Sequence, residues 1–321
     1  MHAPAPALAW LLASLLQSAP DPSAPAQSMA ARAARFGAVT FPALADSFEV
    51  PGAVIAVVHA DSIVTRAGFG YADLEARVPV DPDRTLFRVG SVSKLVTATM
   101  VMRLVERGSI ALHADVDAFL TRVRVPDAFG QPVTAHDLLT HTAGFDERIF
   151  GAGAPDTAPD LERFLAETLP PRIAPPGQIH LYSNHGYGLL GLLVADVTGR
   201  PFPEVVRREV FEPLGMHRSS FAQPPPGALI DDLATGYAAG GRRPVPLPLD
   251  YMAFGPAGSL TSTATDMARF MMFHLGGEPA GGGHVVADST RAIMQGPRWR
   301  THPRMPGMGY GVFGTELGRY R

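Results

Sequence analysis

Ser91 and Lys94 are the residues of this sequence whose types and spacing most directly suggest chemistry. The sequence contains 27 lysines and arginines, and Lys94 is the only lysine among them. An arginine side chain stays protonated in proteins, whereas a buried lysine can lose its proton and act as a base. A serine hydroxyl is a weak nucleophile until such a base lies beside it. Because residues three apart share a helix face, a helix beginning near Ser91 would bring the two side chains together.

The residues around Ser91 predict a turn followed by an amphipathic helix. Gly90 permits a tight turn. Apolar residues then recur at helical spacing as far as Arg107, and Gly108 is typical of the position after a helix end. Ser91 would lie at the helix N-terminus, where free N–H groups and the helix dipole favour negative charge. The same pattern fits a structural role in which Ser91 caps the helix and Lys94 is solvated, and this stretch alone leaves both interpretations open.

Tyr182 and Asn184 form a second candidate stretch. They follow a loop rich in proline and glycine and precede a strongly apolar helix expected from about residue 186 to residue 198, with Gly199 as its stop. A turn held by a buried helix is rigid, which suits a functional site. A tyrosine in such a place also has a structural interpretation, as an apolar ring with one satisfied hydroxyl.

The rest of the chain predicts an α+β fold. Residues 28–48 indicate a helix, residues 53–59 and 63–71 indicate a β-hairpin, and the alternation in residues 308–316 indicates a late strand. We expect an antiparallel sheet built from the N- and C-terminal parts of the chain, with a largely helical region between about residues 80 and 275. Further helices are expected at 115–120, 134–141, 160–169, 203–210 and 264–274. Residues 222–250 indicate an extended surface segment, and residues 255–262 a turn.

Composition excludes several classes of function. The net charge of −3 provides no basic surface for nucleic acid. The sequence contains no cysteine, so a thiolate metal site and a cysteine nucleophile are excluded. The eleven histidines form no His-Glu-x-x-His pattern, so we expect no metal and no other cofactor. The expected partner is a small-molecule or peptide substrate.

The N-terminus resembles a secretory signal. An apolar run from Ala7 to Leu16 is followed by Ala24-Pro25-Ala26, so residues 1–26 are expected to be a signal peptide and the protein to be exported to the periplasm or the exterior. The run lacks a preceding lysine or arginine, and a disordered tail rich in alanine and proline is the alternative. The run is also too short to span a bilayer, and no later segment is long and apolar enough.

Taken together, these stretches resemble the serine β-lactamase and D,D-peptidase superfamily, in particular the branch with class C β-lactamases, D,D-carboxypeptidases and related esterases. Ser91-Val92-Ser93-Lys94 matches the Ser-x-x-Lys motif, and Tyr182-Ser183-Asn184 matches the Tyr-x-Asn motif of that branch. The resemblance spans about residues 30 to 316. It includes four flanking stretches, which are residues 87–90, 137–144, 213–216 and 257–263.

The resemblance implies a β-lactamase/transpeptidase-like fold and a serine hydrolase that works through an acyl-enzyme. Ser91 would be the acylated nucleophile, and its own N–H would be one oxyanion donor. Lys94 would hold Tyr182 partly ionised, and either of the two would be the base. Asn184 would bind the substrate amide. His141 lies in a flanking stretch and receives no chemical role. The substrate would be an amide, a β-lactam or an ester.

The sequence departs from the family at a third motif, Lys-Thr-Gly or His-x-Gly, which the family carries on a late strand beside the site. Lys-Thr-Gly is absent here, and the one His-x-Gly pattern, His274-Leu275-Gly276, lies at the end of an expected helix and not on a late strand. Residues 27–321 are therefore expected to form a hydrolase domain that is incomplete at its C-terminus. Without that motif the competing hypothesis is a penicillin- or peptide-binding protein of the same fold that does not hydrolyse its ligand.

Overall fold

The computed structural model describes residues 28–148, 153–154, 157–238, 244–278 and 280–315. The expected signal peptide, residues 1–26, lies outside the described residues. No helix among the described residues is both long and apolar enough to cross a membrane.

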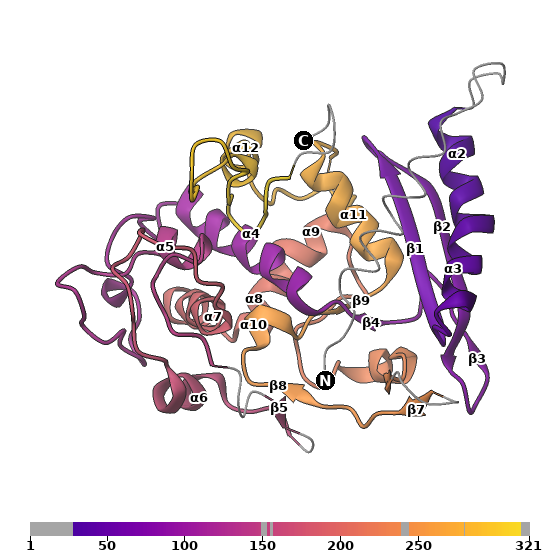
Figure 1. Ribbon diagram of the computed structural model, residues 1–321, viewed down its shortest axis with the longest axis horizontal. Coiled ribbons are helices and arrows are strands. Elements are labelled where there is room, and N and C mark those ends of the chain that lie inside the picture. The colour runs from indigo at the N-terminus through magenta and orange to yellow at the C-terminus, as the bar shows by residue number, and fades with distance from the viewer. Residues whose placement is uncertain (1–27, 149–152, 155–156, 239–243, 279, 316–321) are drawn as a thin grey trace.

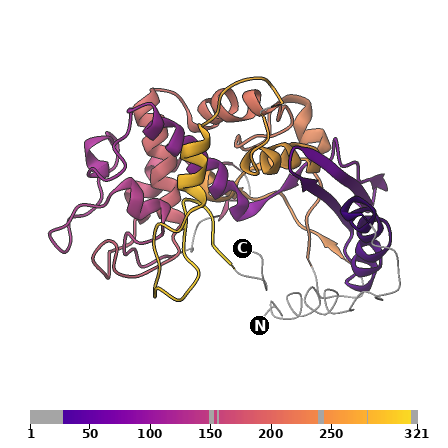
Figure 2. The same ribbon diagram turned by 90° about the horizontal axis from the view of Figure 1, so that it is seen from above.

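A helical run and an antiparallel hairpin form one end of the molecule (Figures 1 and 2). The run is continuous through α2 (Met29–Arg35), η1 (Phe36–Thr40) and α3 (Phe41–Ser47). Strand β1 (Gly52–His59) pairs with β2 (Ser62–Asp73), from Gly52 opposite Gly70 to His59 opposite Ser62. The short β3 (Val78–Pro79) pairs with the end of β2 and completes a three-stranded sheet in the order β1-β2-β3. The predicted helix and hairpin are therefore confirmed.

In the remainder of the described chain, most of the regular secondary structure is helical. The longer helices are α4 (Ser93–Glu106), α6 (Leu161–Thr168), α7 (Asn184–Thr198), α11 (Ala264–His274) and α12 (Asp288–Gln295). The shorter helical segments are η2 (Gly90–Val92), η3 (Val116–Ala118), α5 (Ala135–Leu139), α8 (Phe202–Val206), η4 (Arg207–Phe211), α9 (Glu212–Leu214), η5 (Gly227–Asp232) and α10 (Gly255–Gly258). Three two-residue pairs join distant segments, namely β4 (Phe87–Arg88) with β9 (Thr261–Ser262), β5 (Gly153–Ala154) with β8 (Tyr251–Met252), and β6 (Tyr237–Ala238) with β7 (Val245–Pro246).

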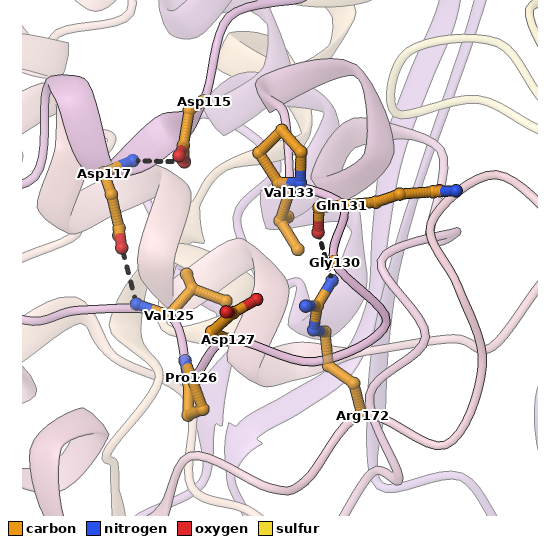
Figure 3. A pocket seen from close by; sticks show the side chains of 10 residues that line it. Asp115, Asp117, Val125, Pro126, Asp127, Gly130, Gln131, Val133 and Arg172 are labelled. Atoms are coloured by element: carbon orange, nitrogen blue, oxygen red, sulfur yellow. Dashed lines mark hydrogen bonds between the residues drawn. The ribbon is translucent and has the colours of Figure 1, made fainter.

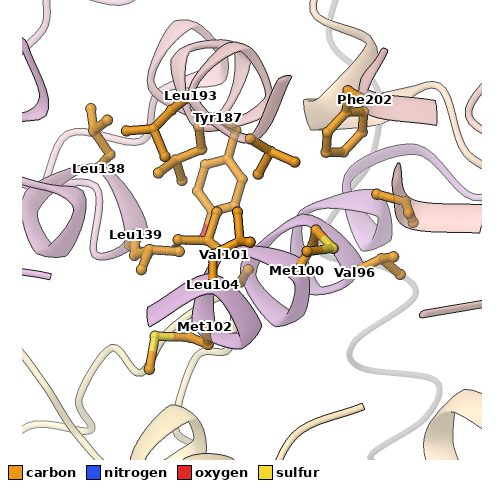
Figure 4. Close-up of a cluster of buried hydrophobic side chains, with 14 of the residues drawn as sticks. Val96, Met100, Val101, Met102, Leu104, Leu138, Leu139, Tyr187, Leu193 and Phe202 are labelled. Atoms are coloured by element: carbon orange, nitrogen blue, oxygen red, sulfur yellow. Dashed lines mark hydrogen bonds between the residues drawn. The ribbon is translucent and has the colours of Figure 1, made fainter. Parts of the chain in front are cut away.

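Helices α4 and α7 form the centre of the hydrophobic core. Val96, Met100 and Val101 of α4 are fully buried, and α7 is apolar on every side. Figure 4 shows Tyr187 of α7 reaching toward α4 beside Val101. A helix that is apolar all round belongs inside a protein rather than on its surface, so these two helices form the frame on which the rest of the helical region packs.

The ends of α7 follow from its sequence. The Ser183 hydroxyl accepts a hydrogen bond from the Gly186 N–H and caps the N-terminus, while Gly199 adopts a left-handed conformation and ends the helix. Gly191 in the middle of α7 allows close contact with α10, because a Cβ at this position would lie 2.0 Å from Cγ of Pro256. The backbone of α10 is thereby brought against α7 and α4.

The mixed helix-and-sheet class with antiparallel pairing is confirmed, but the predicted strand at residues 308–316 is wrong. The described part of this segment has only isolated bridges, from Met308 to Trp299 and to Phe313. Gly311 adopts a positive φ, and a Cβ there would lie 2.9 Å from the Ala98 Cβ on α4. The segment therefore turns back and packs on α4 instead of extending as a strand.

Two smaller predictions also need correction. Residues 255–262 are not a simple turn, because they contain the helix α10 and the strand β9. The segment 222–250 is not extended throughout, because it contains the 3₁₀ helix η5 and a short pair of strands.

Candidate active site

Ser91 lies in the middle of η2, the 3₁₀ turn that leads directly into α4. The chain enters this turn from β4, which pairs with β9, and the Val89 N–H donates to the Leu260 carbonyl at 3.0 Å. Gly90 then adopts a φ of +54°, a conformation that favours glycine. These contacts fix the backbone before Ser91, α4 begins two residues after it, and Ser91 itself remains exposed to solvent.

The Ser91 hydroxyl does not cap the helix. Neither η2 nor α4 has a side-chain cap at its N-terminus. Instead, Ser91 Oγ lies 3.2 Å from Lys94 Nζ and 2.8 Å from the Tyr182 hydroxyl. The structural interpretation of the Ser91–Lys94 pair is therefore wrong, and the two side chains meet as the spacing predicted.

Lys94 is buried, with an exposed fraction of 4%. Its Nζ donates to Asn184 Oδ1 at 2.8 Å and to the Ala257 carbonyl at 2.9 Å, in addition to its contact with Ser91. Burial lowers the pKa of Lys94 to about 8, and the negative charge of Glu147 opposes part of that change. Lys94 is thus a lysine that can be neutral close to physiological pH.

Tyr182 reaches Ser91 from the residue before the α7 cap. Its ring stacks on His141, with the ring centroids 4.5 Å apart, and 38% of the residue is exposed. Lys94 Nζ lies over the face of the Tyr182 ring, 4.8 Å from its centroid. The expected coupling between Lys94 and Tyr182 therefore takes the form of a cation–π contact rather than a bond at the hydroxyl.

His141 supports Tyr182, a function that the sequence did not indicate. It adopts a φ of +57°, and its Nδ1 accepts a hydrogen bond from the Ser183 N–H at 3.0 Å. Burial lowers the pKa of His141 to about 3, with further contributions from His180 and Lys94, so the ring is neutral. A neutral ring whose Nδ1 accepts carries its proton on Nε2. His141 thereby fixes both the Tyr182 ring and the start of α7.

Asn184 occupies the first position of α7 and contacts the other site residues. Its Oδ1 binds Lys94, and its backbone N–H donates to Glu147 Oε1 at 2.9 Å. The structure therefore brings together all four residues that the sequence indicated, Ser91, Lys94, Tyr182 and Asn184. The role of Asn184 in binding a substrate amide stays a prediction.

Glu147 and the Ala257 carbonyl are parts of the site that the sequence did not reveal. Glu147 accepts hydrogen bonds from the turn that carries Tyr182 and Asn184. The only feature of the sequence that could have indicated Glu147 is its position shortly after the flanking stretch 137–144. The Ala257 carbonyl belongs to α10, and no side-chain pattern could have indicated a backbone atom.

A separate hollow beside α5 carries no catalytic arrangement (Figure 3). The Arg172 guanidinium there donates to the carbonyls of Ala128 and Gln131, which fixes the loop between them. The carboxylates of Asp115 and Asp117 accept backbone N–H groups. Among the described residues, no group of three or more histidines, aspartates or glutamates could hold a metal ion.

Residues 39–319 match the family model described as Beta-lactamase. The chain belongs to this family. It is 33% identical over 263 residues to Penicillin-binding protein 4 of Amycolatopsis lactamdurans, covering 79% of this chain and 68% of that protein. It is 35% identical over 297 residues to Esterase EstB of Burkholderia gladioli, covering 88% of this chain and 74% of that protein.

A solved structure shares the fold at similar identity. The octameric penicillin-binding protein homologue from Pyrococcus abyssi aligns with a TM-score of 0.70 and 29% identity, covering 85% of this chain and 63% of that chain. This chain thus spans between 63% and 74% of the lengths of the three proteins. The resemblance to the serine β-lactamase and D,D-peptidase superfamily is confirmed, and with it the assignment to the serine hydrolases.

Proposed function

We propose that this protein is a serine hydrolase that forms an acyl-enzyme on Ser91 and cleaves an amide, β-lactam or ester bond. The observation that carries the proposal is the arrangement of hydrogen-bond partners around Lys94 Nζ. Ser91 Oγ, Asn184 Oδ1 and the Ala257 carbonyl surround this nitrogen at 3.2, 2.8 and 2.9 Å.

The number of protons on Lys94 decides what this arrangement can do. An ammonium group has three N–H donors, one for each of the three neighbours. A neutral amine has two, and the closest acceptors are Asn184 Oδ1 and the Ala257 carbonyl. The nitrogen lone pair is then left to face Ser91 Oγ, which is the geometry of a general base beside a nucleophile. Of the two candidate bases, we therefore favour Lys94.

The proposed acylation proceeds as follows. Ser91 Oγ forms a bond to the substrate carbonyl carbon while its proton passes to Lys94 Nζ. The bond between that carbon and the leaving nitrogen or oxygen then breaks. The leaving group takes the proton from Nζ, either directly or through the Tyr182 hydroxyl, which lies 2.8 Å from Ser91 Oγ. Addition of water to the acyl carbon, with the same base, would release the acid and restore Ser91.

The substrate class rests on the relatives and on the exposure of the site. The names of the penicillin-binding protein and the esterase suggest different substrates, a β-lactam for the first and an ester for the second. Both substrates are acyl compounds that could react with an exposed serine. Ser91 and Val92 are exposed, and Tyr182 is partly exposed next to them. An acyl compound can therefore approach Ser91 without displacing a core residue.

A non-hydrolytic penicillin- or peptide-binding protein is the second candidate. One observation favours it, namely that Lys-Thr-Gly is absent and the one His-x-Gly pattern, His274-Leu275-Gly276, lies at the C-terminal end of α11 and not on a strand. Such a protein would use the same Ser91 and Lys94 to form an acyl adduct and would then release it slowly or not at all. Turnover separates the two functions.

The test compares the wild-type protein with Ser91→Ala on p-nitrophenyl esters, nitrocefin and a peptide that ends in D-Ala-D-Ala. We expect hydrolysis of at least one substrate class and a loss of roughly 10³-fold or more in Ser91→Ala, because removing a nucleophile leaves only residual catalysis. Unchanged hydrolysis in the variant would contradict the proposal. A stable adduct on Ser91 without turnover would support the binding protein instead.

A further inference from the structure

Glu147 lies behind the turn that carries Tyr182 and Asn184, and its carboxylate holds three consecutive residues of that turn. It accepts a hydrogen bond from the Ser183 hydroxyl at 2.7 Å and from the Asn184 N–H at 2.9 Å, and His185 Nδ1 lies 3.3 Å away. The Glu147 side chain has an exposed fraction of only 16%. A mostly buried carboxylate with this many contacts strongly constrains the backbone that surrounds it.

The donors in this network can be assigned from the other bonds that they make. The Ser183 oxygen accepts the Gly186 N–H at 2.9 Å, so its own proton is available for Glu147. On the far side, His185 Nε2 lies 3.3 Å from the Thr168 hydroxyl, so the ring is held at both nitrogens. The turn is consequently fixed by Glu147 on one side and by the contact of His185 with Thr168 of α6 on the other.

Glu147 is ionised in this network. Burial alone would raise its pKa, but the hydrogen bonds from His185, Ser183 and the Asn184 N–H outweigh burial and hold the pKa of Glu147 below its usual value. The charge lies close to Lys94, since Asn184 links the two by giving its N–H to Glu147 and its Oδ1 to Lys94. Lys94 forms no ion pair within the part of the chain that the structure describes.

We propose that Glu147 is a positioning residue for the reaction, which holds the Tyr182–Asn184 turn against Ser91 and places a negative charge on the far side of Asn184 from Lys94. This inference rests on the proposed function, because it names a residue that acts on the same site through other residues. It does not require Glu147 to touch the substrate.

The two parts of this role predict different behaviour for different substitutions. Glu147→Gln removes the charge and keeps the side-chain length, so the pKa of Lys94 should fall. Glu147→Asp keeps the charge but shortens the side chain, so the turn should loosen while the pKa of Lys94 stays close to that of the wild type. The other titratable groups that face this network are His141, His185, Tyr182 and Tyr187, and none of them is substituted in either variant.

The single lysine makes the experiment direct. Protein labelled with ¹³C at the lysine Cε gives one side-chain NMR signal, whose pH titration reports Lys94 alone. Wild-type protein should titrate at about pH 8. Glu147→Gln should titrate at a lower pH, and Glu147→Asp should not shift. Glu167→Gln provides a matched control, because Glu167 is an exposed residue of α6 that pairs with Arg163.

The rate of Ser91 acylation by a fluorophosphonate completes the experiment. We expect Glu147→Gln to move the midpoint of the pH profile in the same direction as the titration, and Glu147→Asp to lower the rate without moving the midpoint. An unchanged Lys94 titration in a folded Glu147→Gln protein would overturn the role of Glu147 and leave the proposed function intact. If Lys94 shifts as expected but wild-type Ser91 is never acylated, the proposed function fails while the electrostatic role of Glu147 stands.

Discussion

The helical region around α4 and α7 and the sheet β1-β2-β3 differ in how completely their apolar side chains are buried. In α4 and α7 the side chains of Val96, Leu190 and Val194 are fully buried. In β1 every residue except His59 is only partly buried, and His59 is exposed. The main cluster of core residues begins at Val96 and contains no residue of the sheet. Apolar packing therefore stabilises the two regions to different extents.

This difference explains where the candidate site lies. Lys94 is part of α4 and Asn184 is part of α7, so two of the groups around Ser91 are carried by the most deeply packed elements of the described chain. The sheet contributes no side chain to the hydrogen bonds of Ser91, Lys94 or Tyr182. A site of this kind gains its precision from elements whose side chains are fixed by packing. Damage to the helical core should accordingly affect the site more than damage to the sheet.

Gly191→Ala should have the largest effect on stability, because it disrupts the close contact between α7 and α10. The added methyl group would lie 2.0 Å from Cγ of Pro256, whose neighbour Ala257 accepts the hydrogen bond from Lys94. We expect a loss of about 3 kcal/mol in the free energy of unfolding, the upper part of the range for overpacking. Acylation of Ser91 should slow as well, since α10 must move. Urea unfolding and fluorophosphonate labelling measure the two effects.

Gly188→Ala on the same helix is the control. A Cβ there would lie 3.2 Å from Cδ2 of Leu165, so this side-chain end needs to shift by only a few tenths of an ångström. Alanine also favours a helix over glycine by about 0.5 to 1 kcal/mol, which offsets the closer contact. Equal losses in the two variants would contradict the importance that we give to the α7–α10 contact.

Val194→Ala and Val57→Ala compare the two regions directly with one and the same substitution. Val194 is fully buried in α7, whereas Val57 of β1 is partly exposed. We expect Val194→Ala to lower the free energy of unfolding by about 2 kcal/mol, because two methyl groups are no longer buried and a cavity remains. At Val57 the loss should be about 1 kcal/mol or less, because less area is removed from water. Equal losses in the free energy of unfolding, or a larger loss in Val57→Ala, would overturn the comparison.

Local patterns were sufficient to predict much of the fold, and together with the family resemblance they indicated the four candidate site residues. The β1–β2 hairpin, α4, and α7 with its Gly199 stop all follow from nearby residues. Ser91 and Lys94 could be paired because helical geometry links positions three apart. The meeting of Tyr182 with Ser91 is a long-range contact, and only the resemblance to a known family indicated it.

The rest depended on tertiary contacts that no local pattern encodes. The segment after Met308 alternates like a strand, but Gly311 turns it against α4. The roles of His141, Glu147 and the Ala257 carbonyl arise where separate segments meet around Lys94 and the start of α7. Nothing in the sequence distinguishes Glu147 from a glutamate that is exposed to solvent.

The most direct measurement of the central claim is the rate at which a fluorophosphonate labels Ser91 from about pH 6 to about pH 10, with the adduct located by peptide mass spectrometry. Because burial lowers the pKa of Lys94 to about 8, the neutral base gains population as the pH rises through that value. We predict labelling on Ser91, a rate that rises with a midpoint at about pH 8, and a flat, much slower profile in Lys94→Ala. An adduct on another residue, or a wild-type rate that Lys94→Ala leaves unchanged, would contradict the account.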